Sequence, residues 1–193
     1  CFWLDLDCGP DKVKENKGYI DQPTALVALK TWCKALGLPR PNVLVNSGRG
    51  VHVYWTFGRM IEEAEWKPLA EKIKALTKEP GKDDAGFDIA PLLTDQTRTA
   101  DIASLMRMPD TIHLKNPADR RPVKVGRIGE HLDFDLFAAR LNELVKDQPA
   151  TATGNHSDLT GGMGTPKGAP SMKLECNEEN RAFVARALEA AGV

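Results

Sequence analysis

Two aspartates, Asp5 and Asp7, are the first residues of this 193-residue sequence whose type and spacing suggest chemistry. They stand two positions apart at the end of an apolar run, residues 2–7, whose alternation is typical of a β-strand, so we expect both side chains on one face. Neighbouring carboxylates repel each other unless a cation neutralises them, and oxygen ligands favour Mg²⁺ or Mn²⁺. The pair alone also fits an ordinary acidic strand end, a nucleotide-sugar transferase or a dehalogenase-type phosphatase.

A glycine-rich turn, Ser47-Gly48-Arg49-Gly50, precedes a second residue of chemical interest, His52. The glycines let backbone N–H groups approach a phosphate closely, and Arg49 can add a forked, charge-assisted contact. Strand alternation over residues 51–57 places His52 on the face opposite the apolar residues. This setting favours ligand binding over a purely structural histidine.

The third segment of interest is residues 99–115, where Asp101 precedes an apolar stretch. A helix N-cap is the simplest alternative role for such an aspartate. Arg107, His113 and Lys115 follow it and concentrate positive charge, as a triphosphate site requires.

The order apolar-DxD, SGRGVHVYW and D…LMRMPDTIHLK resembles the catalytic subunits of archaeo-eukaryotic primases and their phage and plasmid primase-polymerase relatives. Asp110 departs from this pattern where a glycine is usual, and Leu114 replaces a small residue. The resemblance implies that two Mg²⁺ or Mn²⁺ ions are held by three catalytic acids, Asp5, Asp7 and Asp101. It also implies nucleotide binding by Ser47, Gly48, Arg49, His52, Arg107, His113 and Lys115.

The function that this resemblance implies is template-directed nucleotidyl transfer, by which a DNA primase or primase-polymerase makes primers or extends DNA for a phage, plasmid or similar element. The partners would be a single-stranded DNA template and NTP or dNTP, with a helicase domain or protein left open. We expect template contacts from a basic stretch, Arg120, Arg121, Lys124 and Arg127. The alternatives are another DxD-dependent phosphatase or nucleotide-sugar transferase, or a catalytically inactive nucleic-acid-binding module.

Bulk composition excludes few classes of protein. The formal net charge is −1, and the four cysteines are scattered (Cys1, Cys8, Cys33 and Cys176), which favours reduced thiols in a cytoplasmic protein over a disulfide framework or zinc site. No apolar run is long enough to span a membrane, so we expect no membrane partner.

Hydrophobic periodicity predicts strands at 2–7, 43–46, 51–57 and 123–128, and helices at 22–36, 61–76 and 136–145. This order predicts an α+β fold with an RNA-recognition-like (ferredoxin-like) core, a mixed or antiparallel sheet and flanking helices. We expect a catalytic domain over 1–147, a flexible linker over 148–172 and, over 173–193, a helical segment that starts a truncated or small C-terminal module. Because the chain opens directly in an apolar strand without methionine, we also expect the catalytic domain to lack its N-terminal part.

Overall fold

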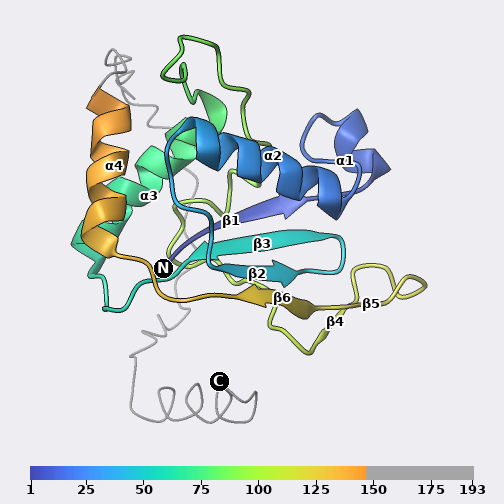
Figure 1. The fold of residues 1–193 in the computed structure, drawn as a ribbon. Coiled ribbons are helices and arrows are strands. Elements are labelled where there is room, and N and C mark those ends of the chain that lie inside the picture. Colours follow the sequence, from blue (N-terminus) through green and yellow to red (C-terminus); the bar gives the residue numbers. More distant parts are fainter. Residues whose placement is uncertain (147–193) are drawn as a thin grey trace, which may run out of the picture. The chain divides into compact units, whose positions relative to one another are not determined.

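The computed structural model describes residues 1–146, and these contain every strand and helix predicted for that range (Figure 1). The elements are β1 (Phe2–Asp7), α1 (Pro10–Lys14), α2 (Gln22–Ala35), β2 (Val43–Asn46), β3 (Gly50–Trp55), α3 (Glu63–Lys78), β4 (Ile112–His113), β5 (Arg121–Pro122), β6 (Lys124–Ile128) and α4 (Phe134–Lys146). The short elements α1, β4 and β5 were not predicted, because so few residues show no periodicity. The predicted linker and C-terminal helix lie outside the described residues.

The main sheet has four strands in the order β1-β3-β2-β6, and each neighbouring pair is antiparallel. The predicted α+β class with an antiparallel sheet and flanking helices is therefore confirmed. The last strand, β6, lies beside β2 at one edge, and β1 forms the other edge. A separate two-stranded ribbon pairs β4 with β5.

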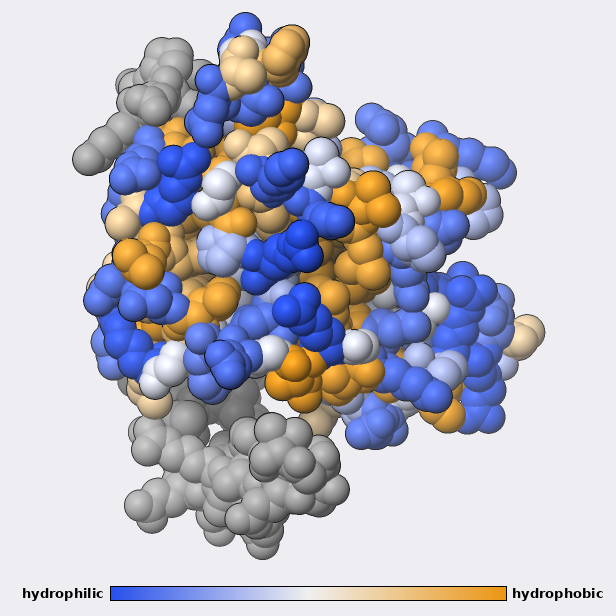
Figure 2. Space-filling view, in the orientation of Figure 1, coloured by the Kyte–Doolittle hydropathy of each residue, from blue (hydrophilic) through white to orange (hydrophobic). Residues whose placement is uncertain are grey.

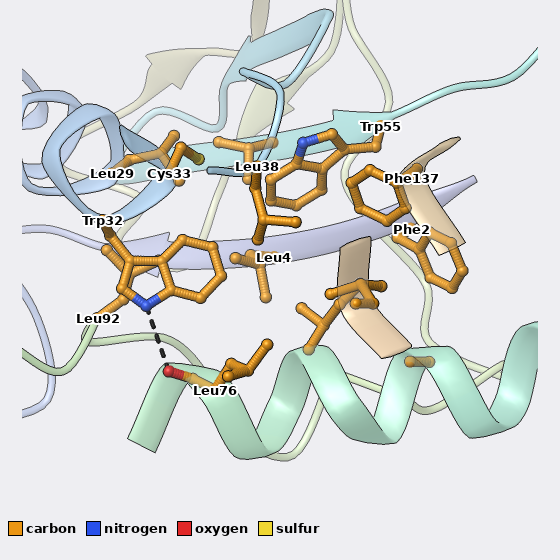
Figure 3. Packing of buried hydrophobic residues seen from close by; sticks show 14 of the residues in the cluster. Phe2, Leu4, Leu29, Trp32, Cys33, Leu38, Trp55, Leu76, Leu92 and Phe137 are labelled. Carbon is orange, nitrogen blue, oxygen red and sulfur yellow. Dashed lines mark hydrogen bonds between the residues drawn. The ribbon is translucent and has the colours of Figure 1, made fainter. Parts of the chain in front are cut away.

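One face of this sheet is covered by α2, α3 and α4 and forms the hydrophobic core (Figure 3). The sheet side of this core is formed by alternate residues of β1 and β3, namely Phe2, Leu4, Leu6, Val51, Val53 and Trp55. The indole Nε1 of Trp32 on α2 donates a hydrogen bond to the Leu76 carbonyl on α3 at 3.2 Å. This bond satisfies the one polar atom of a fully buried tryptophan and joins the two helices that cover the sheet.

Helix α2 has clear sequence signals at both ends. Asp21 is its N-cap and accepts a hydrogen bond from the Thr24 N–H at 2.9 Å, and Pro23 lies in the first turn. The chain leaves the helix through Gly37, whose φ of 62° is the left-handed conformation that glycine adopts most easily. These signals fix where the polypeptide re-enters the sheet as β2.

The opposite face of the sheet carries the polar residues of β1 and β3. An irregular segment runs along the free edge of β1, where the Asp95 N–H donates to the Asp5 carbonyl at 2.9 Å and the Trp3 indole donates to the Arg98 carbonyl at 3.1 Å. This segment brings charged side chains from residues 95–107 to the same face as Asp5.

Within residues 1–146, no helix has both the length and the apolar character needed to cross a membrane.

Candidate active site

Asp5 and His52 are cross-strand neighbours on the face of the sheet that the helices leave uncovered. The Nε2 atom of His52 lies 3.8 Å from Oδ1 of Asp5, and the Tyr54 hydroxyl lies 3.5 Å from Nδ1 of His52. The prediction that His52 faces away from the apolar side of β3 is confirmed by this register. His52 is nevertheless buried, because the irregular segments also cover this face.

Asp5 is a buried carboxylate with an incomplete set of partners. It is only 6% exposed, and its Oδ1 atom has no hydrogen-bond partner among the described residues. Burial, followed by repulsion from Asp7, raises the pKa of Asp5 to about 6. A buried acid of this kind is a recurrent feature of functional sites, since an ion or substrate supplies the missing partner.

Asp7, the second acid of the pair, is paired with a lysine. Lys12 on α1 places Nζ 2.6 Å from Asp7 Oδ2, and the hydrogen bond with Asp7 is the largest of the effects that together raise the pKa of Lys12. Asp7 pairs in register with Gly50 on β3, as Asp5 does with His52, so the predicted common face of the two aspartates is confirmed.

Asp95 and Arg98 are site residues that sequence reasoning missed. The Nε atom of Arg98 lies 3.8 Å from Asp5 Oδ2 and 3.4 Å from Asp95 Oδ2, so this arginine lies between two acids. Burial raises the pKa of Asp95, but hydrogen bonds from Thr97 outweigh it and leave that pKa lowered. The only signal in the sequence was an acid and an arginine three residues apart in an irregular stretch, which does not separate a site from a solvated loop.

Positive charge surrounds the two histidines of the site. Burial, followed by Arg107 and Arg98, lowers the pKa of His52 to about 4, so its ring is neutral at neutral pH. His113 is 5% exposed, and neither of its ring nitrogens has a hydrogen-bond partner among the described residues. Burial and then Arg107 and Arg49 lower the pKa of His113 as well. An anion held here would meet several cations and two unused ring nitrogens.

The glycine-rich turn packs against the β4–β5 ribbon. Gly48 has a φ of 90°, and a β-carbon there would lie 3.0 Å from the His113 β-carbon and 3.1 Å from that of Arg121. Arg49 and Arg121 both form ion pairs with Asp119, at 2.7 and 2.9 Å. The turn and the ribbon are thus fitted to each other, and Ser47 is buried at their junction.

The structure brings together most, but not all, of the residues expected to form the site. Asp101 is exposed, and its carboxylate accepts hydrogen bonds from the Ser104 hydroxyl at 2.9 Å and the Ala103 N–H at 3.2 Å. Lys115 is exposed beside His113 and acts on it electrostatically. Of the four predicted template residues, Arg121 contacts the turn through Gly48, whereas Arg120, Lys124 and Arg127 are exposed on the loop and edge strand beyond it.

Divalent cations fit the chemistry of this donor set only in part. The uncompensated Oδ1 of Asp5 and the carboxylates of Asp7 and Asp95 are the hard oxygen ligands that Mg²⁺ and Mn²⁺ use. Over residues 1–146, however, no three acidic, histidine or cysteine side chains converge on one point as a formed metal site. Lys12 and Arg98 occupy the space between the acids, so a cation would have to replace or displace them.

Comparison with known proteins leaves the family of this chain open. No protein-family model matches the chain, and no curated protein matches its sequence. One solved structure that resembles it is the AEP domain of the primase-polymerase (PrimPol) of cyanophage S-2L, with 20% sequence identity and a TM-score of 0.41. The similarity covers 77% of this chain and 59% of the phage domain, so the chain spans less than two thirds of that protein. Membership of the primase family therefore stays a prediction from the sequence motifs.

Proposed function

We propose that this chain catalyses template-directed nucleotidyl transfer, as a DNA primase or primase-polymerase of a phage, plasmid or similar element, in the cytoplasm of its host. The observation that carries the proposal is the arrangement around Asp5, a buried acid whose Oδ1 atom has no hydrogen-bond partner among the described residues. Both negative side chains, Asp7 and Asp95, and positive ones, Arg98 and Arg107, act on it electrostatically, and His52 lies 3.8 Å away. The negative side chains of such a site attract a cation, and its positive side chains attract a polyanion. A nucleoside triphosphate with divalent ions meets both needs.

Asp5 and Asp7 would hold the ions, and the third carboxylate would come from Asp95 or Asp101. When bound, the two Mg²⁺ or Mn²⁺ ions would lower the pKa of the attacking 3′-hydroxyl and neutralise charge on the departing pyrophosphate. The rest of the chemistry falls to positioning and electrostatics, so no side-chain nucleophile is required.

The residues of the chain would bind the triphosphate from the side opposite the acids. His52 is neutral, and with Nδ1 facing the Tyr54 hydroxyl its Nε2 can carry the proton and donate to a phosphate oxygen. Arg107 and Lys115 both act electrostatically on His113, and these three side chains would neutralise phosphate charge. Arg49 would contact the same triphosphate from the turn, and Ser47 and Gly48 form the backbone of that turn.

The proposal is tested by incorporation of labelled nucleotides on a single-stranded template with a primer, with Mg²⁺ or Mn²⁺, comparing wild type with Asp5→Asn and Asp7→Asn. We expect both variants to lose at least about a hundredfold of the activity, the scale on which a positioned catalytic group acts. A reaction without primer separates chain initiation from extension. A reaction without template tests the alternative functions, because a phosphatase or sugar transferase consumes its nucleotide substrate whether or not DNA is present.

An absence of template-dependent synthesis by the folded wild type would contradict the proposal. Equal activity in wild type and Asp5→Asn would contradict it as well, because the synthesis would then come from a contaminant or another site.

A further inference from the structure

A cavity of about 470 Å³ lies at the tip of the β2–β3 hairpin, and its lining includes neither the acids Asp5 and Asp7 nor His52. We call it the hairpin-tip cavity; its walls include Cys8 after β1, Ile20, Asp21 and Gln22 before and in α2, Arg49 of the turn, and Arg121 of β5. Figure 2 shows the surface hollowed between the part built by α1 and the part built by the β4–β5 ribbon.

The cavity opens on the helix-covered side of the sheet, whereas the acids lie on the other side. Asn46 lines it and pairs in register with Val51, whose side chain points into the core under the helices. Asp5 pairs with His52 on the opposite face. A ligand in this cavity would therefore reach the Asp5 site only around the β2–β3 turn, where Arg49 lies.

One end of the cavity is basic and already ordered. Asp119 Oδ2 lies 2.7 Å from Arg49 Nη2 and 2.9 Å from Arg121 Nη2, so one carboxylate holds two guanidinium groups together. Arg121 Nη1 also donates to the Gly48 carbonyl at 3.3 Å, and the buried Nε of Arg49 has no partner among the described residues. Two arginines held in this way lose little side-chain freedom when they bind a phosphate.

The other end of the cavity accepts hydrogen bonds and is negative. The Asp21 carboxylate caps α2 through Oδ1, and the Gln22 amide nitrogen donates to Asn46 Oδ1 at 2.8 Å and to the Gly50 carbonyl at 3.1 Å, which leaves the Gln22 amide oxygen to accept. This end suits the N–H groups of a nucleobase and disfavours further phosphates.

We propose that the hairpin-tip cavity binds one nucleotide of a single-stranded nucleic acid, with its phosphate at Arg49 and Arg121 and its base toward Asp21 and Gln22. The cavity volume lies within the range of roughly 300–1,000 Å³ typical of small-ligand sites. A strand fits better than a free triphosphate, because a strand carries one charge per nucleotide and continues around the turn to the Asp5 face. This inference extends the proposed function. It rests on that function only for the identification of the bound strand as a template.

The first test measures fluorescence anisotropy of a short, labelled, single-stranded oligodeoxynucleotide without divalent cations or free nucleotide. Ile20→Glu adds a negative charge to the cavity wall at a side chain that is 53% exposed, so the fold should tolerate it. Val27→Glu is the matched control, since Val27 is 65% exposed on α2 and does not line the cavity. We expect Ile20→Glu to weaken binding roughly fivefold and Val27→Glu to change it by less than about twofold.

The second test separates the cavity from a diffuse basic surface. Arg121→Gln should lower the slope of log affinity against log salt by about 0.7, the value for one phosphate contact with a single strand. Arg40→Gln is the control, since Arg40 is exposed and does not line the cavity, and it should lower the slope by clearly less. Circular dichroism melts of all four variants establish that they are folded.

Equal effects of Ile20→Glu and Val27→Glu, or of Arg121→Gln and Arg40→Gln, would overturn the cavity as the binding site. The assignment would also be overturned if Ile20→Glu weakened the binding of a labelled nucleoside triphosphate but did not weaken the binding of the oligonucleotide. Failure of the proposed function is distinguishable, because strand binding in these assays needs no catalysis. It should persist in Asp5→Asn even if the wild type incorporates no nucleotide.

Discussion

Lys12 Nζ lies 2.6 Å from Asp7 Oδ2, so a side chain of the protein itself neutralises one of the two β1 aspartates. Lys12 stands in α1, a single short helix between β1 and the loop that returns to Tyr19, and both residues of the pair are about one-third exposed. A divalent cation that binds Asp7 must therefore compete with this lysine. Among residues 1–146, the neighbouring Asp5 has no comparable lysine partner, and its Oδ1 atom is left without a hydrogen bond.

Removing the competing lysine should strengthen cation binding. We expect Lys12→Gln to raise the affinity for Mn²⁺ about fivefold, because a partly exposed ion pair contributes up to about 1 kcal/mol. Lys14→Gln is the control, since Lys14 is in the same helix and its ion pair is with Asp11, at 4.0 Å. Free Mn²⁺ measured by electron paramagnetic resonance during titration reports the affinity. A weaker affinity in Lys12→Gln would show that Lys12 supports the metal site and does not compete with it.

Asp5→Asn should stabilise the metal-free protein at neutral pH. Burial raises the pKa of Asp5 to about 6 from 3.8, so the charged form is disfavoured in the folded state by up to about 3 kcal/mol above pH 6. This penalty shrinks as the pH falls through 6 and is absent below 3.8, since the acid is then protonated in both states. The gain of the variant in free energy of unfolding should therefore be present at pH 7.5 and disappear near pH 4.

Urea unfolding at the two pH values measures this gain, with Asp84→Asn as the control because Asp84 is exposed. Added Mn²⁺ should stabilise the wild type and leave Asp5→Asn unchanged. A destabilised Asp5→Asn at pH 7.5 would mean that the carboxylate is better compensated than its contacts indicate.

Asp95 and Asp101 compete for the role of third carboxylate. Asp95 acts electrostatically on Asp5, whereas the Asp101 carboxylate is bonded to Ser104 and Ala103 within its own turn. On this geometry we expect Asp95→Asn to weaken Mn²⁺ binding about tenfold and Asp101→Asn to change it by less than about twofold. Isothermal titration calorimetry of both variants provides the comparison. The reverse order would support the assignment that the primase resemblance implies and require residues 98–107 to rearrange on binding.

Gly50 should be intolerant of any side chain. A β-carbon there would overlap the Leu6 carbonyl of β1, at the point where β1 and β3 are paired and Asp7 faces the site. We expect Gly50→Ala to cost at least about 2 kcal/mol of unfolding free energy, because backbone atoms cannot move aside without breaking the pairing. Gly58→Ala is a matched control with no atom near its β-carbon, and it should change stability by less than about 0.5 kcal/mol. Similar melting temperatures for the two variants would contradict the close β1–β3 approach.

Sequence periodicity was sufficient for the four strands of the main sheet and the three longer helices. The strand at residues 2–7 and the helix from residue 22 were predicted almost to the residue, because alternation, an Asp21 cap and a glycine stop act locally. The opposite orientation of His52 and the apolar residues of β3 followed from the same alternation. Such features depend on neighbours in the chain, which a sequence displays directly.

The composition of the site depended on contacts that are distant in sequence. Asp95 reaches Asp5 across 90 residues of chain, and Asp119 reaches Arg49 across 70. Neither acid stands in a recognisable pattern. The same folding buries Asp5 and leaves its Oδ1 atom without a partner within residues 1–146, and burial contributes more to the raised pKa of this acid than its sequence neighbour Asp7 does. The amino-acid sequence thus determined the strand that carries Asp5 and Asp7 and the turn before His52. Only the tertiary structure decided which charges surround them, because electrostatic interactions depend on distance in space and on exclusion of water.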